Sequence, residues 1–451
     1  MLEVVTIETA ALGDRSYVVS DGSAALVVDP QRDIDRVLAV LDSRGLRVTH
    51  VFETHVHNDY LTGGLDLAAR TGARYVVAGA EDVAFDRYPV GDGSRIEVGD
   101  LVVDVLHTPG HTPHHLSYVV GDGDVPGAVF TGGSLLYGTV GRTDLLGEAL
   151  ARQLTLAQHR SVRRLVEQLP DHVAVYPTHG FGSFCSSTEG SGATASTIAD
   201  ERRGNVAVQI DDPEAFAAAL LGGLAAYPRY YALMGPRNRR GPEPIDLSPP
   251  PALDEATARD RATDDGHWVV DLRDRRAFAA AHLPGTINVA HDQQAATHLG
   301  WVLPAGHEVT LLASDDATIA AAQRDFARIG IDRPAGAAVC DPAASDGPLR
   351  SYPVADFAAL AAADGVHVLD VRRRDEWDKG HLRGAQHIPF FDVPARLDEV
   401  PRDGPVWVHC ASGARAAIVA SLLDAADIPV VLVDDRWAHA AAAGLDITDG
   451  P

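Results

Sequence analysis

Four histidines stand in local contexts that suit a shared metal ion. His55 and His57 are one residue apart, directly after the apolar run 49–53, so both imidazoles leave an extended segment on the same side. His111 follows a Thr-Pro-Gly turn and His179 lies in a Pro-Thr-His-Gly turn, each after another apolar run. The chain has 20 histidines, so a solvated loop is the alternative for any one of them, but together the four predict a metal cleft. Surface positions, or positions just behind the ligands, are expected for the histidines without such a context: His50, His107, His114 and His115.

A cysteine loop near the C-terminus suits nucleophilic sulfur chemistry. The apolar run 406–409 leads into Cys410, and an apolar stretch at 416–423 predicts a helix just after Arg415. Such a strand, loop and helix N-terminus surround the sulfur with backbone N–H groups and a guanidinium, which favour a thiolate or persulfide anion. The residues between the two ends of the loop are Ala411, Ser412, Gly413 and Ala414.

The length of this loop separates two kinds of chemistry. Four residues between Cys410 and Arg415 suit a bound sulfur atom, whereas cysteine phosphatases use five and make a wider cradle for a phosphate. A buried structural thiol is the alternative. The pattern predicts a sulfur-transfer nucleophile, with Cys410 and Arg415 as the catalytic pair.

The cysteine loop belongs to the second copy of an internal repeat. Both copies alternate apolar strand-like runs with helical stretches, which predicts two small parallel α/β domains. The residues that recur at a constant offset of 99 are Asp271 and Asp370, Arg273 and Arg372, Phe278 and Trp377, His282 and His381, and Gly285 and Gly384.

The first copy lacks the residues of the loop. It has Ala313 at the cysteine position, Asp316 at the glycine and Thr318 at the arginine. Without a nucleophile, a turn glycine or a cation, this copy is predicted to be inactive.

The N-terminal part has a different pattern. Apolar runs at 24–28, 49–53, 74–77, 101–106 and 128–130, with helical stretches near 34–43 and 154–169, predict an α/β sandwich whose polar residues lie in loops at strand ends. Proline density from Pro236 to Pro251 then predicts an extended linker.

Composition excludes several classes of protein. The chain carries 38 Lys+Arg against 63 Asp+Glu, a formal charge of −25, which repels nucleic-acid phosphates. Three cysteines are too few and too scattered for a disulfide framework. The N-terminus has no basic segment typical of a signal peptide, and no run reaches the ~20 apolar residues of a membrane span. A cytoplasmic protein without a membrane or nucleic-acid partner is expected.

The first ~235 residues resemble the metallo-β-lactamase superfamily, and within it the glyoxalase II and persulfide dioxygenase branch. The matching stretches are 54–64, 108–111, 131–136, 141–144 and 178–180. Two positions depart from the superfamily motif, because Tyr60 stands where a histidine is usual and Gly133 stands where a bridging aspartate is usual.

The resemblance implies a site for two metal ions, and the two departures remove ligands from it. The ligands of the first ion are intact as His55, His57 and His111. The second ion keeps only Asp59 and His179, which seldom hold an ion against water. One metal ion is therefore predicted, held by three imidazoles and leaving positions for water, oxygen or substrate.

Persulfide dioxygenases hold one iron with two histidines and one aspartate, which map to His55, His111 and Gly133. His57 could complete a three-histidine site, and Asp144 could instead supply the missing carboxylate. The resemblance also places Arg142 toward the cleft, where it suits the carboxylates of a glutathione-like substrate, with an ion pair to Asp144 as the alternative. Tyr60 is expected to offer a phenol to the cleft or to fill the space of the lost ligand.

The last ~100 residues resemble a rhodanese domain. The whole chain is thus predicted to be α/β, an αββα metallo-β-lactamase sandwich followed by two rhodanese-like parallel α/β domains. The predicted parts are a metal domain at 1–235, a proline-rich linker at 236–254, an inactive rhodanese-like domain at 255–345 and a rhodanese domain with the catalytic cysteine at 350–451.

Three hypotheses about function follow. The first is a persulfide dioxygenase with one iron(II) ion that oxidises a glutathione-like persulfide to sulfite with O2, joined to a sulfurtransferase that handles sulfite or thiosulfate. The second is a hydrolase of glutathione thioesters that uses zinc. The third is a metal-free scaffold that serves the rhodanese domain. A homo-oligomer is compatible with each.

Overall fold

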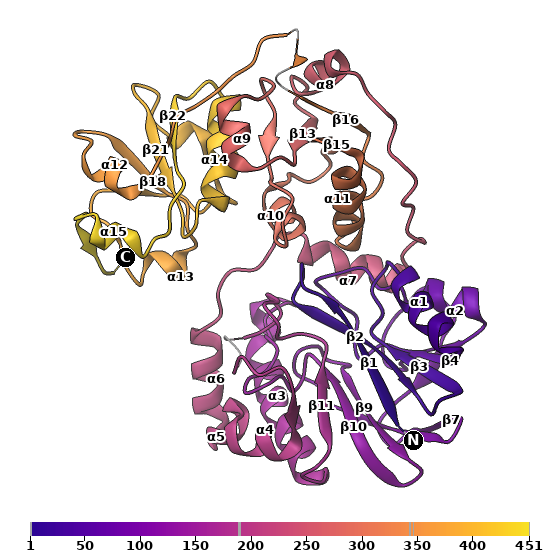
Figure 1. Cartoon of the computed structure of the whole chain (residues 1–451). Coiled ribbons are helices and arrows are strands. Elements are labelled where there is room, and N and C mark those ends of the chain that lie inside the picture. The colour runs from indigo at the N-terminus through magenta and orange to yellow at the C-terminus, as the bar shows by residue number, and fades with distance from the viewer. Residues whose placement is uncertain (1, 188–190, 342–343, 346, 451) are drawn as a thin grey trace. The chain divides into compact units, whose positions relative to one another are not determined.

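The computed structural model describes residues 2–187, 191–341, 344–345 and 347–450. The chain divides into two compact units, residues 1–245 with 328–330, and residues 246–327 with 331–451. Residue 346, in the predicted gap between the two repeats, lies outside the described residues. Figure 1 shows the succession of elements along the chain.

Two six-stranded sheets form the first unit, and strongly apolar strands form their facing sides. The strands of the first sheet, in spatial order, are β1 (Glu3–Thr9), β2 (Asp14–Ser20), β3 (Ala24–Val28), β4 (Arg47–Phe52), β5 (Arg74–Ala78) and β6 (Tyr88–Val90). Those of the second are β12 (Ser196–Thr197), β11 (Ala174–Pro177), β10 (Val125–Gly132), β9 (Leu116–Asp122), β8 (Leu101–His107) and β7 (Arg95–Val98).

Helices cover the outer faces of both sheets. One apolar cluster lies between the first sheet and α1 and α2, and another lies between the second sheet and α3. The predicted αββα sandwich is confirmed, with each predicted strand and helix present. The helices of this unit are α1 (Asp35–Arg44), α2 (Gly64–Thr71), α3 (Glu148–Gln168), α4 (Ile198–Gly204), α5 (Val206–Gln209), α6 (Pro213–Gly222) and α7 (Tyr231–Arg240).

The first residues of the predicted linker belong to helix α7. Residues 236–240 were expected to be extended, yet they continue this helix through Pro236. Proline removes one helical hydrogen bond, but Tyr231, Met234 and Asn238 are buried, so tertiary packing outweighs the local cost. The extended part of the linker starts only after Arg240.

The second unit contains two parallel sheets. The first runs β14 (Ile287–Asn288), β13 (His267–Asp271), β15 (Glu308–Ala313) and β16 (Gly336–Val339). The second runs β20 (Gln386–His387), β18 (His367–Asp370), β21 (Val406–His409), β22 (Val430–Val433) and β17 (Val354–Ala355). Because the shared strands follow the same order, the two sheets have the same topology.

The remaining elements accompany these sheets. The helices of the second unit are α8 (Glu255–Arg261), α9 (Arg275–Ala280), α10 (Ala295–Val302), α11 (Asp316–Arg328), α12 (Phe357–Ala361), α13 (Arg374–Trp377), α14 (Ala414–Ala425) and α15 (His439–Ala442), with 3-10 turns η2 (Val393–Ala395) and η3 (Leu397–Glu399). A short antiparallel pair joins β19 (His381–Leu382) and β23 (Ile447–Thr448).

Side-chain contacts repeat along with the topology. Asp271 pairs with Arg273 at 2.5 Å, and Asp370 pairs with Arg372 at 2.6 Å. His282 stacks on Phe278 and His381 stacks on Trp377, each at an interplanar angle of 9°. The duplication predicted from the sequence therefore extends to the internal contacts of each copy.

Among the described residues, no helix combines the length and the apolar character that crossing a membrane requires.

Candidate functional site

The histidines of the first unit lie in loops at the ends of four strands. His55 and His57 follow β4, His111 follows β8, and His179 follows β11. All four side chains are at most 3% exposed. Because these strands end at one edge of the sandwich, residues up to 124 positions apart meet there.

Three of these imidazoles converge. One ring nitrogen each from His55, His111 and His179 lies within 4.8 Å of the others. The Nε2 atoms of His55 and His179 are 3.3 Å apart, and the buried Nε2 of His111 has no hydrogen-bond partner. A buried nitrogen that has no hydrogen-bond partner and lies close to two other ring nitrogens is typical of a metal-binding site.

The second nitrogen of each ring is held by the protein. Nδ1 of His55 contacts Thr54 Oγ1 at 2.9 Å, and Nδ1 of His111 donates to the Arg142 carbonyl at 2.7 Å. Nδ1 of His179 contacts Asp14 at 2.8 Å and Asp59 at 3.1 Å. These contacts orient Nε2 of each ring toward the common point.

The electrostatics of the three rings differ. Burial, together with His179, lowers the pKa of His111 to about 3, so its Nε2 keeps a free lone pair. Although burial opposes a charge, Asp59 and Asp14 raise the pKa of His179 to about 10. Without a metal, His179 is therefore protonated, and a cation would replace that proton.

His57 is predicted to complete the ligand set with His55 and His111, and its two ring nitrogens have different surroundings in the structure. Its Nε2 lies 3.3 Å from Asp29, 3.2 Å from Glu53 and 3.0 Å from the Tyr60 hydroxyl. Although burial opposes a charge, Asp29 and Glu53 raise the pKa of His57 to about 9. Two buried carboxylates thus hold Nε2 of His57. Its buried Nδ1 has no hydrogen-bond partner, and His57 forms a second group that could hold a metal ion together with Asp59 and His179.

Tyr60 belongs to the same buried cluster. Its ring stacks on His57 at 4.3 Å, and its side chain is fully buried. The phenol therefore fills space behind the cleft, which is the second of its two expected roles.

The lack of a side chain at Gly133 leaves room for the His111 ring. A Cβ atom at this position would overlap the His111 ring, so a carboxylate cannot enter here without moving that imidazole. The Gly133 N–H instead donates to Nε2 of His115 at 3.0 Å. His115 is fully buried and stacks on His55 at 5.0 Å, so it belongs to the expected positions behind the ligands.

Arg142 and Asp144 form an ion pair with each other. The guanidinium binds both carboxylate oxygens, at 2.7 and 2.8 Å, and donates to the carbonyls of Phe184 and Ala225. Arg142 is 3% exposed. The structure therefore gives Arg142 the ion pair rather than a substrate contact, and it keeps Asp144 from the metal position.

Sequence reasoning missed several buried polar residues around these loops. Their signal was weak because none of them belongs to a motif that the sequence reading used, and only the fold brings them together with the rings. They are Asp14, which contacts His179 beside the expected Asp59, Asp29 and Glu53 at His57, and Asn238 of α7, which donates to the carbonyls of His57 and Tyr60.

The cysteine loop has the geometry expected of an anion cradle. Cys410 follows β21, its Sγ accepts from the Gly413 N–H at 3.2 Å, and α14 begins at Ala414. Gly413 has a φ of 89°, which glycine tolerates best. The residues between Cys410 and Arg415 thus form a tight turn that leads the sulfur to a helix N-terminus.

Arg415 is paired with a carboxylate. Its guanidinium binds both oxygens of Glu376, at 2.5 and 2.8 Å. Although burial opposes ionisation, Arg415 lowers the pKa of Glu376 to about 2. The ion pair fixes Arg415 at the first turn of α14, beside the loop that it closes.

Two family profiles match the parts of the chain that contain the two sites. The profile of the metallo-beta-lactamase superfamily matches residues 13–179, and that of the rhodanese-like domain matches residues 353–438. The bovine persulfide dioxygenase ETHE1 is 30% identical over 200 residues, which cover 43% of this chain and 68% of the relative. The chain belongs to the metallo-β-lactamase superfamily.

Other known proteins are similar over different shares of the chain. Human persulfide dioxygenase ETHE1 is 28% identical over 54% of this chain and 81% of its own length. A hydroxyacylglutathione hydrolase from Methylobacillus flagellatus is 32% identical over 40% of this chain and 67% of its own length. The crystal structure of a metallo-beta-lactamase from Staphylococcus aureus is similar with a TM-score of 0.66 and 28% identity, over 74% of this chain and 98% of that chain.

Proposed function

We propose that the chain is a sulfur-metabolism enzyme that joins a persulfide dioxygenase to a sulfurtransferase. The observation that carries this proposal is the presence, on one chain, of three convergent imidazoles and a cysteine loop of the length that suits a sulfur atom. The similarity to persulfide dioxygenases and the rhodanese profile support it.

His55, His111 and His179 are the residues that would hold one iron(II) ion. When bound there, iron would supply the activation of O2 that organic side chains lack. The net reaction converts a persulfide, O2 and water into the thiol, sulfite and two protons. Asp14 and Asp59 hold His179 in place by accepting from its Nδ1–H, and Arg142 fixes His111 through its carbonyl.

Cys410 carries out the second reaction. Its thiolate attacks the outer sulfur of a persulfide donor, the S–S bond of the donor breaks, and the donor thiolate leaves with the electron pair, so that Cys410 becomes a persulfide. Sulfite then attacks the outer sulfur, so that a new S–S bond forms thiosulfate and the electron pair of the broken bond returns to Cys410 Sγ. The Gly413 N–H and the helix N-terminus stabilise the anionic sulfur at both stages.

The first experiment loads the protein with ferrous iron and measures O2 uptake with glutathione persulfide. The proposal expects uptake that His55→Ala removes, together with Cys410-dependent transfer of sulfur from thiosulfate to cyanide. Absence of uptake from iron-loaded protein that still transfers sulfur would refute the dioxygenase half.

A hydrolase of glutathione thioesters is the second candidate, because hydroxyacylglutathione hydrolases are also similar to the first unit. The glycine at position 133 weighs against it, since a bridging carboxylate is absent there and His111 fills the space. Bound zinc with thioesterase turnover would favour this candidate.

A further inference from the structure

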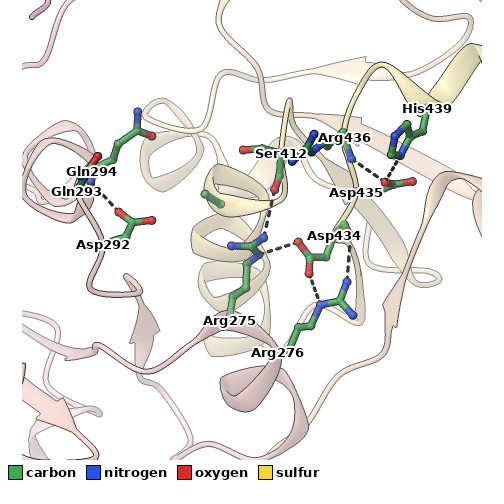
Figure 2. A pocket seen from close by; sticks show the side chains of 11 residues that line it. Arg275, Arg276, Asp292, Gln293, Gln294, Ser412, Asp434, Asp435, Arg436 and His439 are labelled. Atoms are coloured by element: carbon green, nitrogen blue, oxygen red, sulfur yellow. Dashed lines mark hydrogen bonds and ion pairs between the residues drawn. The ribbon is translucent and has the colours of Figure 1, made fainter. Parts of the chain in front are cut away.

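A pocket lies beside the cysteine loop, between the two repeats of the second unit. Its volume is about 750 Å³. Arg275 and Arg276, at the start of α9, line it from the repeat that has no cysteine, whereas Ser412, Ala414 and Asp434 line it from the repeat that has one. Figure 2 shows the two arginines converging on Asp434.

Asp434 lies directly behind the turn of the loop. It follows β22 and is 7% exposed, and a Cβ atom added to Gly413 would overlap its carboxylate. Gly413 is the residue whose N–H donates to Cys410 Sγ. The buried carboxylate of Asp434 therefore lies next to the loop in which the proposed reaction forms an anionic sulfur on Cys410.

Both arginines of the cysteine-free repeat neutralise that charge. Arg275 Nε binds one oxygen of Asp434 at 2.7 Å, and Arg276 Nε binds the other at 2.5 Å. Arg275 also donates to the Ser412 carbonyl at 3.4 Å, so it contacts the loop itself (Figure 2).

In the described part of the repeat that has the cysteine, no basic side chain forms an ion pair with Asp434. Arg415, the cation at the end of the loop, binds Glu376 through both terminal nitrogens. Of the other charged groups at the pocket, Asp435 pairs with His439 at 2.6 Å, and Asp292 and Arg436 lie on the pocket wall. An unpaired Asp434 would repel any anion that approaches Cys410, because its carboxylate is buried against the turn of the loop.

We propose that Arg275 and Arg276 are positioning residues for sulfur transfer, which act through Asp434 to hold the Cys410 loop and to make its pocket accept anionic sulfur compounds such as thiosulfate and sulfite. This role rests on the proposed sulfurtransferase activity. It gives the cysteine-free repeat a function, as the supplier of the two cations that bind Asp434.

The test compares two alkylating probes of similar size, anionic iodoacetate and neutral iodoacetamide, by the mass of the Cys410 peptide. In Arg275→Gln/Arg276→Gln, the ratio of the iodoacetate rate to the iodoacetamide rate falls about tenfold, and kcat/KM for thiosulfate falls in parallel. Adding Asp434→Asn restores both, because the unpaired charge is gone. Arg275→Lys/Arg276→Lys keeps most of the ratio.

Arg383→Gln is the control, since it removes an exposed ion pair, with Asp446, elsewhere in the repeat that has the cysteine. An unchanged ratio in the double glutamine variant would overturn the proposal, as would an equal fall for both probes or a failure of Asp434→Asn to restore the ratio. If the wild-type protein transfers no sulfur at all, the proposed activity fails, whereas the alkylation ratio still decides whether the arginines act as inferred.

Discussion

Each of the three convergent imidazoles is held by a different kind of acceptor. A hydroxyl holds His55, a backbone carbonyl holds His111, and two carboxylates hold His179. A carboxylate behind a ligating imidazole makes it more basic and a stronger ligand. We therefore expect His179 to contribute strongly to metal affinity, although it is the last of the four histidines along the chain.

Replacing His179 tests this ligand set. His179→Ala leaves two ligands and lowers metal affinity by about 100-fold or more, so the purified variant should retain little metal by elemental analysis. His172→Ala, which removes an exposed histidine of the same unit, should retain the wild-type content. Full metal content in His179→Ala would contradict the set.

Cys410→Ser tests the nucleophile. A hydroxyl cannot carry sulfane sulfur, so transfer from thiosulfate to cyanide should fall to background. Cys340→Ser, which removes a buried cysteine of the other repeat, should keep the wild-type rate. Equal rates in wild type and Cys410→Ser would exclude Cys410 as the carrier.

The Glu376–Arg415 pair predicts a pH dependence of stability. The pKa of Glu376 is about 2 in the folded chain against an ordinary value of 4.5, so ionised Glu376 stabilises the fold above pH 4.5 and loses this effect as the pH falls toward 2. Glu376→Gln should lower the free energy of unfolding by about 1–3 kcal/mol at pH 7. The difference from wild type should shrink steadily below pH 4.5.

Urea unfolding at several pH values measures that difference. Glu308→Gln, at a largely exposed glutamate of the same unit, is the control. A difference that stays constant from pH 7 to pH 3 would contradict the assigned ion pair.

The sequence predicts which residue types meet at the metal cleft, but not which nitrogens point inward. His55 and His57 have the same local pattern, and spacing alone places both rings on one side. Asp29 and Glu53 distinguish the two rings, because they contact Nε2 of His57 and leave Nδ1 as its nitrogen without a partner. Since these carboxylates lie on a neighbouring strand end and on the loop itself, only the fold reveals their effect.

At the scale of elements, apolar periodicity predicts the strands and helices of the sandwich well. Strand β8 alternates buried and half-buried residues, whereas β3 is apolar and buried throughout, and both patterns are visible in the sequence. Helix α7 escapes prediction because its proline content favours a linker, whereas its stability comes from contacts distant in sequence.

Helix α7 supports the histidine loop through Asn238. Its amide donates to the carbonyls of His57 and Tyr60 at 2.8 Å and accepts from the Thr62 N–H at 3.0 Å. Asn238→Ala leaves two buried carbonyls and an N–H without partners, which should cost about 2–3 kcal/mol in the free energy of unfolding. It should also weaken metal binding.

Thermal unfolding and metal titration measure these effects. Leu233→Ala, at a position of the same helix that is 54% exposed, should change neither. If Asn238→Ala behaves like Leu233→Ala, the loop does not depend on α7.

At the scale of the whole molecule, the charge of −25 opposes the capture of anionic substrates. Salt screens such repulsion. We therefore expect kcat/KM for thiosulfate to rise roughly two- to fivefold between low salt and 0.2 M salt, while the rate of Cys410 alkylation by neutral iodoacetamide stays constant. A fall with salt would mean that local cations outweigh the net charge.

The duplication is the whole-molecule feature most readily predicted from the sequence, because pairs such as Phe278 and Trp377 recur at one offset. The relation between the copies is not visible in that pattern. Arg275 and Arg276 have no special context in the sequence, and only the structure shows that they bind Asp434 beside the other copy's cysteine.

The central claim is that three imidazoles of the first unit hold one metal ion that serves oxygen chemistry. Elemental analysis combined with X-ray absorption at the metal edge, on protein as purified, tests it most directly. The account predicts one iron per chain with three imidazole nitrogens among its ligands, and loss of one of these in His179→Ala. Two zinc ions per chain, or an iron site unchanged in that variant, would contradict it.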